Sequence, residues 1–162
     1  MESVCITAMT LKKPTSPEMW AAARRLVEEY ATSLNFDMGF QDFTHEIESL
    51  PVEYGPPNGC FLLAESDGAF VGCVGLRRFS EIECEMKRLY VAPAYRTGGI
   101  GRVLAEGLIS EAKSIGYKTM LLDTLPSMKR AHNLYLSLGF TPTTPYCYNP
   151  LPGATFFQLQ LQ

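Results

Sequence analysis

A glycine-rich stretch between a predicted strand and a predicted helix carries the clearest chemistry in this sequence. In the segment VAPAYRTGGIGRVLAEGLISEAK, three glycines stand where a helix would begin, with an arginine on either side: Gly98, Gly99, Gly101, Arg96 and Arg102. A helix N-terminus has unpaired N–H groups and about half a positive charge, so it attracts anions. Glycines remove the side chains that would keep a ligand from the backbone. The stretch is therefore suited to holding a phosphate.

Two well-known phosphate motifs do not fit this stretch. The dinucleotide pattern G-x-G-x-x-G fails because Leu104 stands at the third glycine position after Gly99 and Gly101. The P-loop pattern fails because no Gly-Lys-Ser/Thr follows. A glycine-rich connection that binds nothing is the alternative at this point.

Length and charge limit the possible classes. A chain of 162 residues is predicted to form one domain spanning residues 1–162, with a core of its own. The net charge of −3 argues against a broad surface for nucleic acid or an anionic membrane. No apolar run approaches the ~20 residues that span a bilayer, and the N-terminus lacks a signal-peptide pattern. We expect a cytoplasmic protein with no nucleic-acid or membrane partner.

The cysteines and histidines predict neither disulfides nor a metal site. Five cysteines are an odd number without a CxxC pair, which indicates buried free thiols in a reducing compartment. The two histidines, His45 and His132, are far apart in the sequence. We therefore expect no bound metal.

Hydrophobic periodicity predicts one α+β domain. A helix is expected from Ser16, the N-cap before Pro17, and a shorter one around Phe43 that ends at Pro51. The remaining predicted elements are strands at 4–11, 60–65, 69–79, 81–91 and 119–124, helices at 102–116 and 127–139 (the latter capped by Ser127), and a C-terminal hairpin at 140–161.

The strand at 81–91 has an irregular side-chain pattern. Ile82, Cys84 and Met86 share one parity, whereas Leu89 and Val91 share the other. Because side chains in a strand alternate with a period of two, this switch predicts a bulge near Arg88. A strand buried on both faces would also give this pattern and is the alternative.

Two motifs in the correct order resemble the GNAT superfamily of acetyl-CoA-dependent N-acetyltransferases. The segment EMKRLYVAPAYRTGGIG contains that family's R/Q-x-x-G-x-G/A as Arg96, Gly99 and Gly101, and AHNLYLSLGF matches its later helix ending in L-Y-x-x-x-G-F. The resemblance runs from about Phe61 to Leu161. It implies a GNAT-like fold, in which four helices flank a central mixed, mostly antiparallel sheet of about six to seven strands with a bulged and splayed fourth strand.

The resemblance also implies a cofactor, acetyl-CoA, and the residues that hold it. Backbone amides between Arg96 and Arg102 would hold the pyrophosphate, and the pantetheine arm would lie along Leu89, Tyr90 and Val91. The implied set is completed by Thr97, Gly98, Gly99, Ile100 and Gly101 in the loop and by Asn133 in the later helix. The sequence departs from the family pattern at Met128, where many members carry an asparagine.

Acetyl transfer needs a neutral amine and a proton for the departing thiolate. Tyr135 occupies the family's L-Y position and is the candidate acid, because a phenol with a pKa of about 10 stays neutral at rest. Tyr135 also shares a helix stripe with Ala131 and Leu138, so a purely structural role is the alternative. Glu85, on the strand where the family often places a carboxylate, is the candidate base. Its rivals are Glu81 and Glu83.

The acceptor is expected to be a primary amine on a small metabolite. The family builds this site largely from the first two helices and the last hairpin, which here correspond to residues 36–43 and to PYCYNPLPG, the segment that contains Tyr146. A basic cluster, Arg77, Arg78, Lys87 and Arg88, suits an amino acid or another acidic amine. Salt bridges from this cluster to Glu81, Glu83 and Glu85 are the alternative.

Three functions are compatible with the sequence. The first is direct acetyl transfer in a ternary complex to a small amine. The others are transfer to protein lysines or N-termini, and a non-catalytic acyl-CoA-binding regulatory domain. A homodimer is also expected to be possible, through an exposed Phe156 in the last strand.

Overall fold

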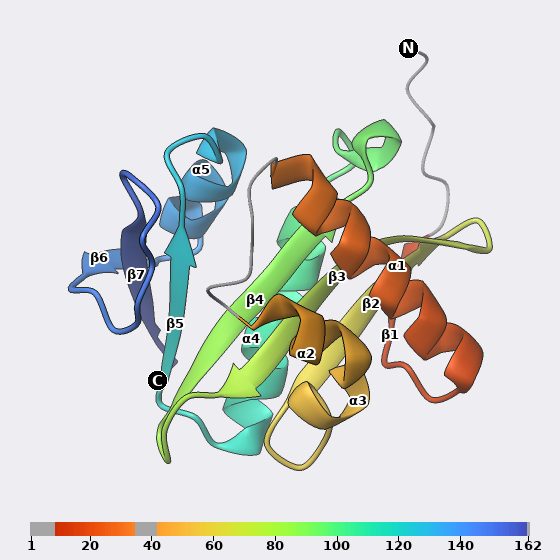
Figure 1. The fold of residues 1–162 in the computed structure, drawn as a ribbon, viewed down its shortest axis with the longest axis horizontal. Helices are drawn as coiled ribbons and strands as arrows, with labels where there is room; N and C mark the ends of the chain where they lie inside the picture. The colour runs from red at the N-terminus through yellow and green to blue at the C-terminus, as the bar shows by residue number, and fades with distance from the viewer. Residues whose placement is uncertain (1–8, 35–41, 162) are drawn as a thin grey trace.

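The computed structural model describes residues 9–34 and 42–161, which form a seven-stranded sheet with helices on both faces (Figure 1). The strand order is β1-β2-β3-β4-β5-β7-β6, and every neighbouring pair is antiparallel except β4 with β5. The strands are β1 (Met9–Lys12), β2 (Cys60–Ser66), β3 (Ala69–Arg78), β4 (Glu83–Val91), β5 (Thr119–Thr124), β6 (Thr141–Thr143) and β7 (Thr155–Gln160). The predicted mixed α+β sheet is confirmed.

The helices form two layers on opposite faces of this sheet (Figure 1). In front of the sheet in Figure 1 lie α1 (Pro17–Leu34), α2 (Phe43–Glu48) and α3 (Leu50–Glu53), and behind it lies α4 (Ile100–Ile115). Side chains of α5 (Lys129–Ser137) pack into the same apolar cluster as α4. Each layer has its own core, with Leu26, Leu50 and Phe61 on one side and Leu104, Leu108 and Met120 on the other.

Local side-chain chemistry explains where the helices begin and end, and two of the predicted helix boundaries are corrected. Ser16 caps α1 as predicted, since its Oγ accepts the Met19 N–H at 3.2 Å. Pro51 does not end a helix: α2 ends at Glu48, and Pro51 lies in the first turn of α3, where its missing N–H costs nothing. Ser127 does not cap α5 either, because the N-cap is Met128 and makes no side-chain cap hydrogen bond.

The predicted first strand is present as β1; its portion before Met9 lies outside the described residues, as does the predicted acceptor segment at 36–41. The predicted C-terminal hairpin is shorter in the structure. It has only the three-residue β6 on one side, and the segment 144–154 consists of turns and irregular chain. Its proline and glycine residues prevent regular pairing there.

The predicted irregularity in β4 is present. Cys73 pairs with Tyr90 and Gly75 pairs with Lys87, so β4 has one more residue than β3 over this interval. The extra residue falls at Arg88, whose φ of 61° lies in the left-handed region. The strand is also buried on both faces from Cys84 to Arg88. The bulge and the two-sided burial, considered as alternatives from the sequence, are therefore both present.

β4 and β5 separate shortly before the bulge. They pair over three positions, from Glu83–Thr119 to Glu85–Leu121, after which the register ends. The splayed fourth strand is thereby confirmed. The space between the two strands is where the cavities described below lie.

Phe156 is not exposed, which corrects the sequence expectation. It has 8% of its surface accessible, and its ring packs against Tyr146 at 5.7 Å between centroids. Tyr146 belongs to the segment between β6 and β7, so this returning segment covers the Phe156 ring. Phe156 therefore offers no contact for a second subunit. None of the helices in residues 9–34 and 42–161 is long and apolar enough to cross a membrane.

Candidate active site

A groove of about 720 Å³ lies between the end of β4 and the start of α5. Its walls come from α1, β4, the loop before α4, and α5. They include Tyr30, Ser33, Leu34, Leu89, Tyr90, Val91, Arg96, Gly99, Gly101, Arg102, Met128 and Leu134. The groove therefore joins the bulged strand to the glycine-rich loop.

The first amides of α4 face this groove without a side-chain cap in the described part of the chain. Gly99 is the N-cap, with φ 76°, and a Cβ built on it would meet no protein atom within 4 Å. The Arg96 Nε donates a hydrogen bond to the Val91 carbonyl at 2.9 Å, which fixes its guanidinium at the groove wall. The helix start is therefore open to a ligand and has a cation beside it.

The rim of the groove is cationic on both sides. Arg96 and Arg102 line it from the α4 side, and Lys129 and Arg130 line it from the first turn of α5. Four cations around an uncapped helix N-terminus create the potential that a polyphosphate requires.

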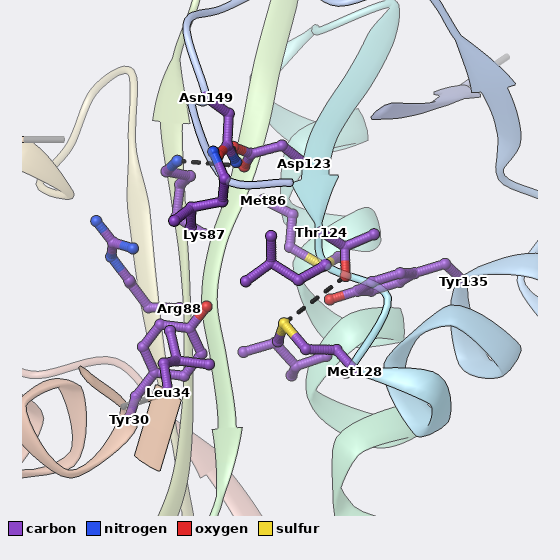
Figure 2. Close-up of a pocket in the computed structure, with 13 residues that line it drawn as sticks. Tyr30, Leu34, Met86, Lys87, Arg88, Asp123, Thr124, Met128, Tyr135 and Asn149 are labelled. Carbon is purple, nitrogen blue, oxygen red and sulfur yellow. Dashed lines mark hydrogen bonds and ion pairs between the residues drawn. The ribbon is translucent and has the colours of Figure 1, made fainter. Parts of the chain in front are cut away.

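The groove adjoins a smaller pocket of about 40 Å³, shown in Figure 2. The two cavities share four lining residues: Tyr30, Leu34, Leu89 and Met128. Thr124 donates a hydrogen bond from its hydroxyl to the Met128 sulfur at 3.8 Å. Met128 therefore stands where the groove and the pocket meet.

The Tyr135 hydroxyl points into this pocket beside Thr124 and Met128 (Figure 2). Tyr135 is 6% exposed, and burial raises the pKa of its phenol. The hydroxyl therefore remains protonated at neutral pH.

A charged pair lies across the pocket from Tyr135. The Lys87 ammonium is 3.5 Å from Oδ1 of Asp123, and the Asn149 side-chain amide donates to Oδ2 at 3.0 Å. All three side chains line the pocket (Figure 2). The Lys87–Asp123 distance exceeds the roughly 2.7–2.9 Å of a close charge-assisted hydrogen bond. Both groups are therefore loosely paired at a wall where a polar ligand would lie.

Glu85 is held by other side chains. Oε1 accepts the Arg77 Nε at 3.2 Å, and Oε2 accepts the Tyr146 hydroxyl at 3.0 Å. Burial, followed by the charge of Glu85, raises the pKa of Tyr146. Glu85 is not among the residues that line the groove or the pocket. Both carboxylate oxygens are occupied, which leaves Glu85 poorly placed to accept a proton from a ligand in the pocket.

Arg77 lies among three carboxylates. Besides Glu85, its guanidinium lies 3.7 Å from Glu46 and 3.8 Å from Glu53. Of the salt bridges expected as an alternative to substrate binding, two to Glu85 are present, from Arg77 and, at 3.9 Å, from the Lys87 ammonium, whereas Glu83 bonds with Ser80. The structure thus brings Arg77, Lys87, Tyr146 and Glu85 into one network, of which only Lys87 lines the pocket.

The predicted cofactor residues divide into two groups. The groove brings together Leu89, Tyr90, Val91, Arg96, Gly99, Gly101 and Arg102. Four others do not line it: Thr97 and Gly98 are exposed in the loop, Ile100 is buried in the core, and Asn133 is exposed on α5. Their roles toward a ligand stay predictions.

Sequence reasoning missed several lining residues, namely Tyr30, Asp123, Lys129, Arg130 and Asn149. One of them carries a signal in the sequence. Asp123 is an acidic residue near the end of the buried strand TMLLDT, and a carboxylate at such a place is rarely buried without a partner. The others come from helices and an irregular segment whose neighbours only the tertiary structure reveals.

Comparison with known proteins connects this geometry to one family. Residues 20–140 match the family described as Acetyltransferase (GNAT) family. An uncharacterized N-acetyltransferase from Schizosaccharomyces pombe is 38% identical over 140 residues, which cover 85% of this chain and 86% of that protein. N-acetylaspartate synthetase from Rattus norvegicus is 34% identical over 113 residues, which cover 65% of this chain and 38% of that protein.

Solved structures share the fold. An acetyltransferase of the GNAT family from Staphylococcus aureus superimposes with a TM-score of 0.78 at 21% identity, covering 96% of this chain and 100% of that one. The acetyltransferase YncA from Salmonella typhimurium, solved with acetyl-CoA, superimposes with a TM-score of 0.68 at 23% identity, covering 96% and 95% of the two chains. At these identities the likeness concerns the fold.

Proposed function

Because the chain belongs to the acetyltransferase (GNAT) family, we propose that it transfers an acetyl group from acetyl-CoA to the primary amine of a small metabolite. The observation that carries the proposal is that the two cavities lie side by side and share a wall. The groove ends at an uncapped, cation-flanked helix N-terminus, and at Met128 it borders a pocket with a phenol and a loose ion pair. One cavity suits a coenzyme and the other suits an amine.

The residues of the groove fit coenzyme A. A Cβ at Gly99 would project into open space at the groove wall, so the glycine keeps that space free for a ligand. The amides at the start of α4 would hold the pyrophosphate, and Arg96, Arg102, Lys129 and Arg130 would balance its charge. The unpaired edge of β4 from Leu89 to Val91 would bind the amide groups of the pantetheine arm.

When bound, acetyl-CoA supplies the acetyl group as a thioester, and side chains of the protein donate and accept the protons. In the net reaction an N–C bond forms, the C–S bond breaks, and one proton leaves the amine while one reaches the sulfur. We assign the proton given to the sulfur to the Tyr135 hydroxyl, which points into the pocket.

For the amine proton we favour a receiver other than the expected Glu85. Asp123 lines the pocket opposite Tyr135, whereas Glu85 lines neither cavity. The Asp123 carboxylate is therefore our candidate for holding the acceptor amine and accepting its proton, directly or through water. Glu85 keeps Arg77 and Tyr146 in place.

Several observations support a small acceptor. The pocket is about 40 Å³, and Asn149 and Leu151 of the segment 144–154 close it on one side. A peptide would need an open channel at this point. Lys87, whose ammonium faces the pocket, suits an amine that also bears a carboxylate, and a relative is named N-acetylaspartate synthetase. We therefore place acidic amino acids first among the candidate acceptors.

A thiol-release assay tests this proposal. The purified protein and acetyl-CoA are incubated with acidic, neutral and basic amino acids, polyamines and short peptides, and free coenzyme A is measured. We expect acceptor-dependent release, highest for acidic amino acids, and a shift toward neutral ones in Lys87→Met. Release with peptides alone would favour the protein acetyltransferase. Binding of acetyl-CoA without release on any amine would favour the non-catalytic domain.

A further inference from the structure

Arg88 occupies an unusual place in the sheet. It is the extra residue in β4, and its φ of 61° is one that L-amino acids with long side chains rarely adopt. The Arg88 carbonyl accepts a hydrogen bond from the Cys73 thiol at 3.3 Å in the buried interior. Something must compensate for this backbone conformation, because a non-glycine residue does not hold it without support.

The compensation comes from the Arg88 side chain. Its guanidinium donates two hydrogen bonds to the Glu46 carboxylate, at 2.8 and 2.9 Å, and the side chains of both residues are 2% exposed. The guanidinium also lies 5.9 Å from the centroid of the Tyr30 ring and 5.5 Å from that of Phe43. A bidentate ion pair with Glu46 and two aromatic rings thus fix the Arg88 guanidinium. These partner groups come from α1 and α2.

The position of this pair matters for the groove. Leu89, Tyr90 and Val91, which follow Arg88 directly, line the groove, and Tyr30 lines both cavities. A shift of Arg88 would therefore move the strand edge and one wall of the pocket together. Glu46 itself lines neither cavity, so its effect on a ligand is indirect.

We propose that the Arg88–Glu46 pair is a positioning device that holds the β4 bulge open toward the groove and thereby sets the affinity for acetyl-CoA. The inference rests on the proposed function, since it names acetyl-CoA as the ligand. The two side chains are 42 residues apart in the sequence, and neither takes part in the proposed proton transfers, although Arg88 also lines the pocket.

A purely structural role for the pair makes different predictions. In that case any core defect of equal severity would have the same effect on binding. Val27 offers a matched control, because it is 0% exposed, lies in the apolar cluster under α1, and lines neither cavity. Val27→Ala removes core volume without touching the bulge.

The variants are Glu46→Gln and Arg88→Lys. Both keep a side chain of similar length and remove the bidentate ion pair. The first measurement is the affinity for acetyl-CoA by calorimetry. The second is amide hydrogen exchange at residues 89–91 in the ligand-free protein. Melting temperatures are measured for all variants, because the control must be as destabilised as the two pair variants. If the melting temperature of Val27→Ala does not match theirs, a milder or more severe core variant replaces it.

We expect both pair variants to raise the Kd for acetyl-CoA about 10-fold and to speed exchange at residues 89–91, and Val27→Ala to do neither at equal melting temperature. In steady state the KM for acetyl-CoA should rise more than kcat falls. Unchanged affinity and exchange in the pair variants, or equal changes in Val27→Ala, would overturn the inference. If the wild-type protein binds no acetyl-CoA, the proposed function fails, and this result is separate from the exchange measurement.

Discussion

Replacing Gly99 by alanine tests the groove with the smallest possible change. Gly99 precedes α4 with φ 76°, and a Cβ there would meet no protein atom within 4 Å. The added methyl group would therefore cause no clash inside the protein. It would occupy part of the groove wall that a ligand approaches.

The structure separates the cost in stability from the cost in binding. Holding an L-residue in the left-handed region costs about 1–2 kcal/mol, which lowers the melting temperature of a domain of this size by about 2–8 °C. If the methyl group keeps an anion from one amide of α4, one charged hydrogen bond worth about 1.5–3 kcal/mol is lost. The Kd for acetyl-CoA should then rise about 10- to 150-fold.

Gly68→Ala is the matched control for this experiment. Gly68 has φ 83° in the turn between β2 and β3, a Cβ there also meets no atom within 4 Å, and the residue lines neither cavity. Calorimetric titration and thermal melting are compared for the two variants. We expect similar losses in melting temperature, and weaker binding in Gly99→Ala alone.

Two results would refute this reasoning. Wild-type affinity in Gly99→Ala, with the expected loss of stability, would mean that the start of α4 does not contact the coenzyme. Equal loss of affinity in Gly68→Ala would mean that binding follows overall stability and not the groove.

Three further predictions concern catalysis, packing and pH. Tyr135→Phe should lower kcat about 100-fold and leave the acetyl-CoA affinity unchanged in initial-rate and binding assays, and an unchanged kcat would exclude the phenol as the acid. Leu108→Ala, at a fully buried position, should lower the free energy of unfolding by about 3 kcal/mol in urea titrations, and a loss below about 1 kcal/mol would contradict its place in the core. Burial alone would raise the pKa of Glu46, but Arg88 outweighs it and lowers the pKa below the ordinary value of 4.5. The stability that this carboxylate contributes is therefore complete above pH 4.5 and is lost as the pH falls through the lowered pKa. In urea titrations at several pH values, the free energy of unfolding of Glu46→Gln should therefore fall less steeply below pH 4.5 than that of the wild type. An identical fall in both proteins would contradict the pairing.

Local signals in the sequence predicted most of the fold. Ser16 and Pro17 marked the start of α1, and the parity switch around Arg88 marked the bulge, because both depend on residues within one turn or a few strand positions. The glycines before α4 predicted the open helix start for the same reason.

The partners of the side chains in and around the site could not be predicted in this way. Glu46 and Arg88 are 42 residues apart, and Asp123 and Asn149 are 26 apart, so their pairing depends on how separate elements meet. Glu85 on β4 was the candidate base, with salt bridges as the alternative, and the structure shows its carboxylate bound by Arg77 and Tyr146 from neighbouring elements. A single sequence carries no information on such partners.

The three residue pairs that join β4 to β5 have a mechanical consequence. They divide the sheet into a half of four strands and a half of three, and the groove takes one wall from β4 and the opposite wall from α5, the helix that follows β5. A molecule that bridges these walls works as a clamp between the halves, so its binding energy adds to their cohesion. When the free ligand concentration is a hundred times its Kd, binding stabilises the folded protein by about 2.7 kcal/mol. The affinity for each coenzyme can therefore be read from the rise in melting temperature that it causes.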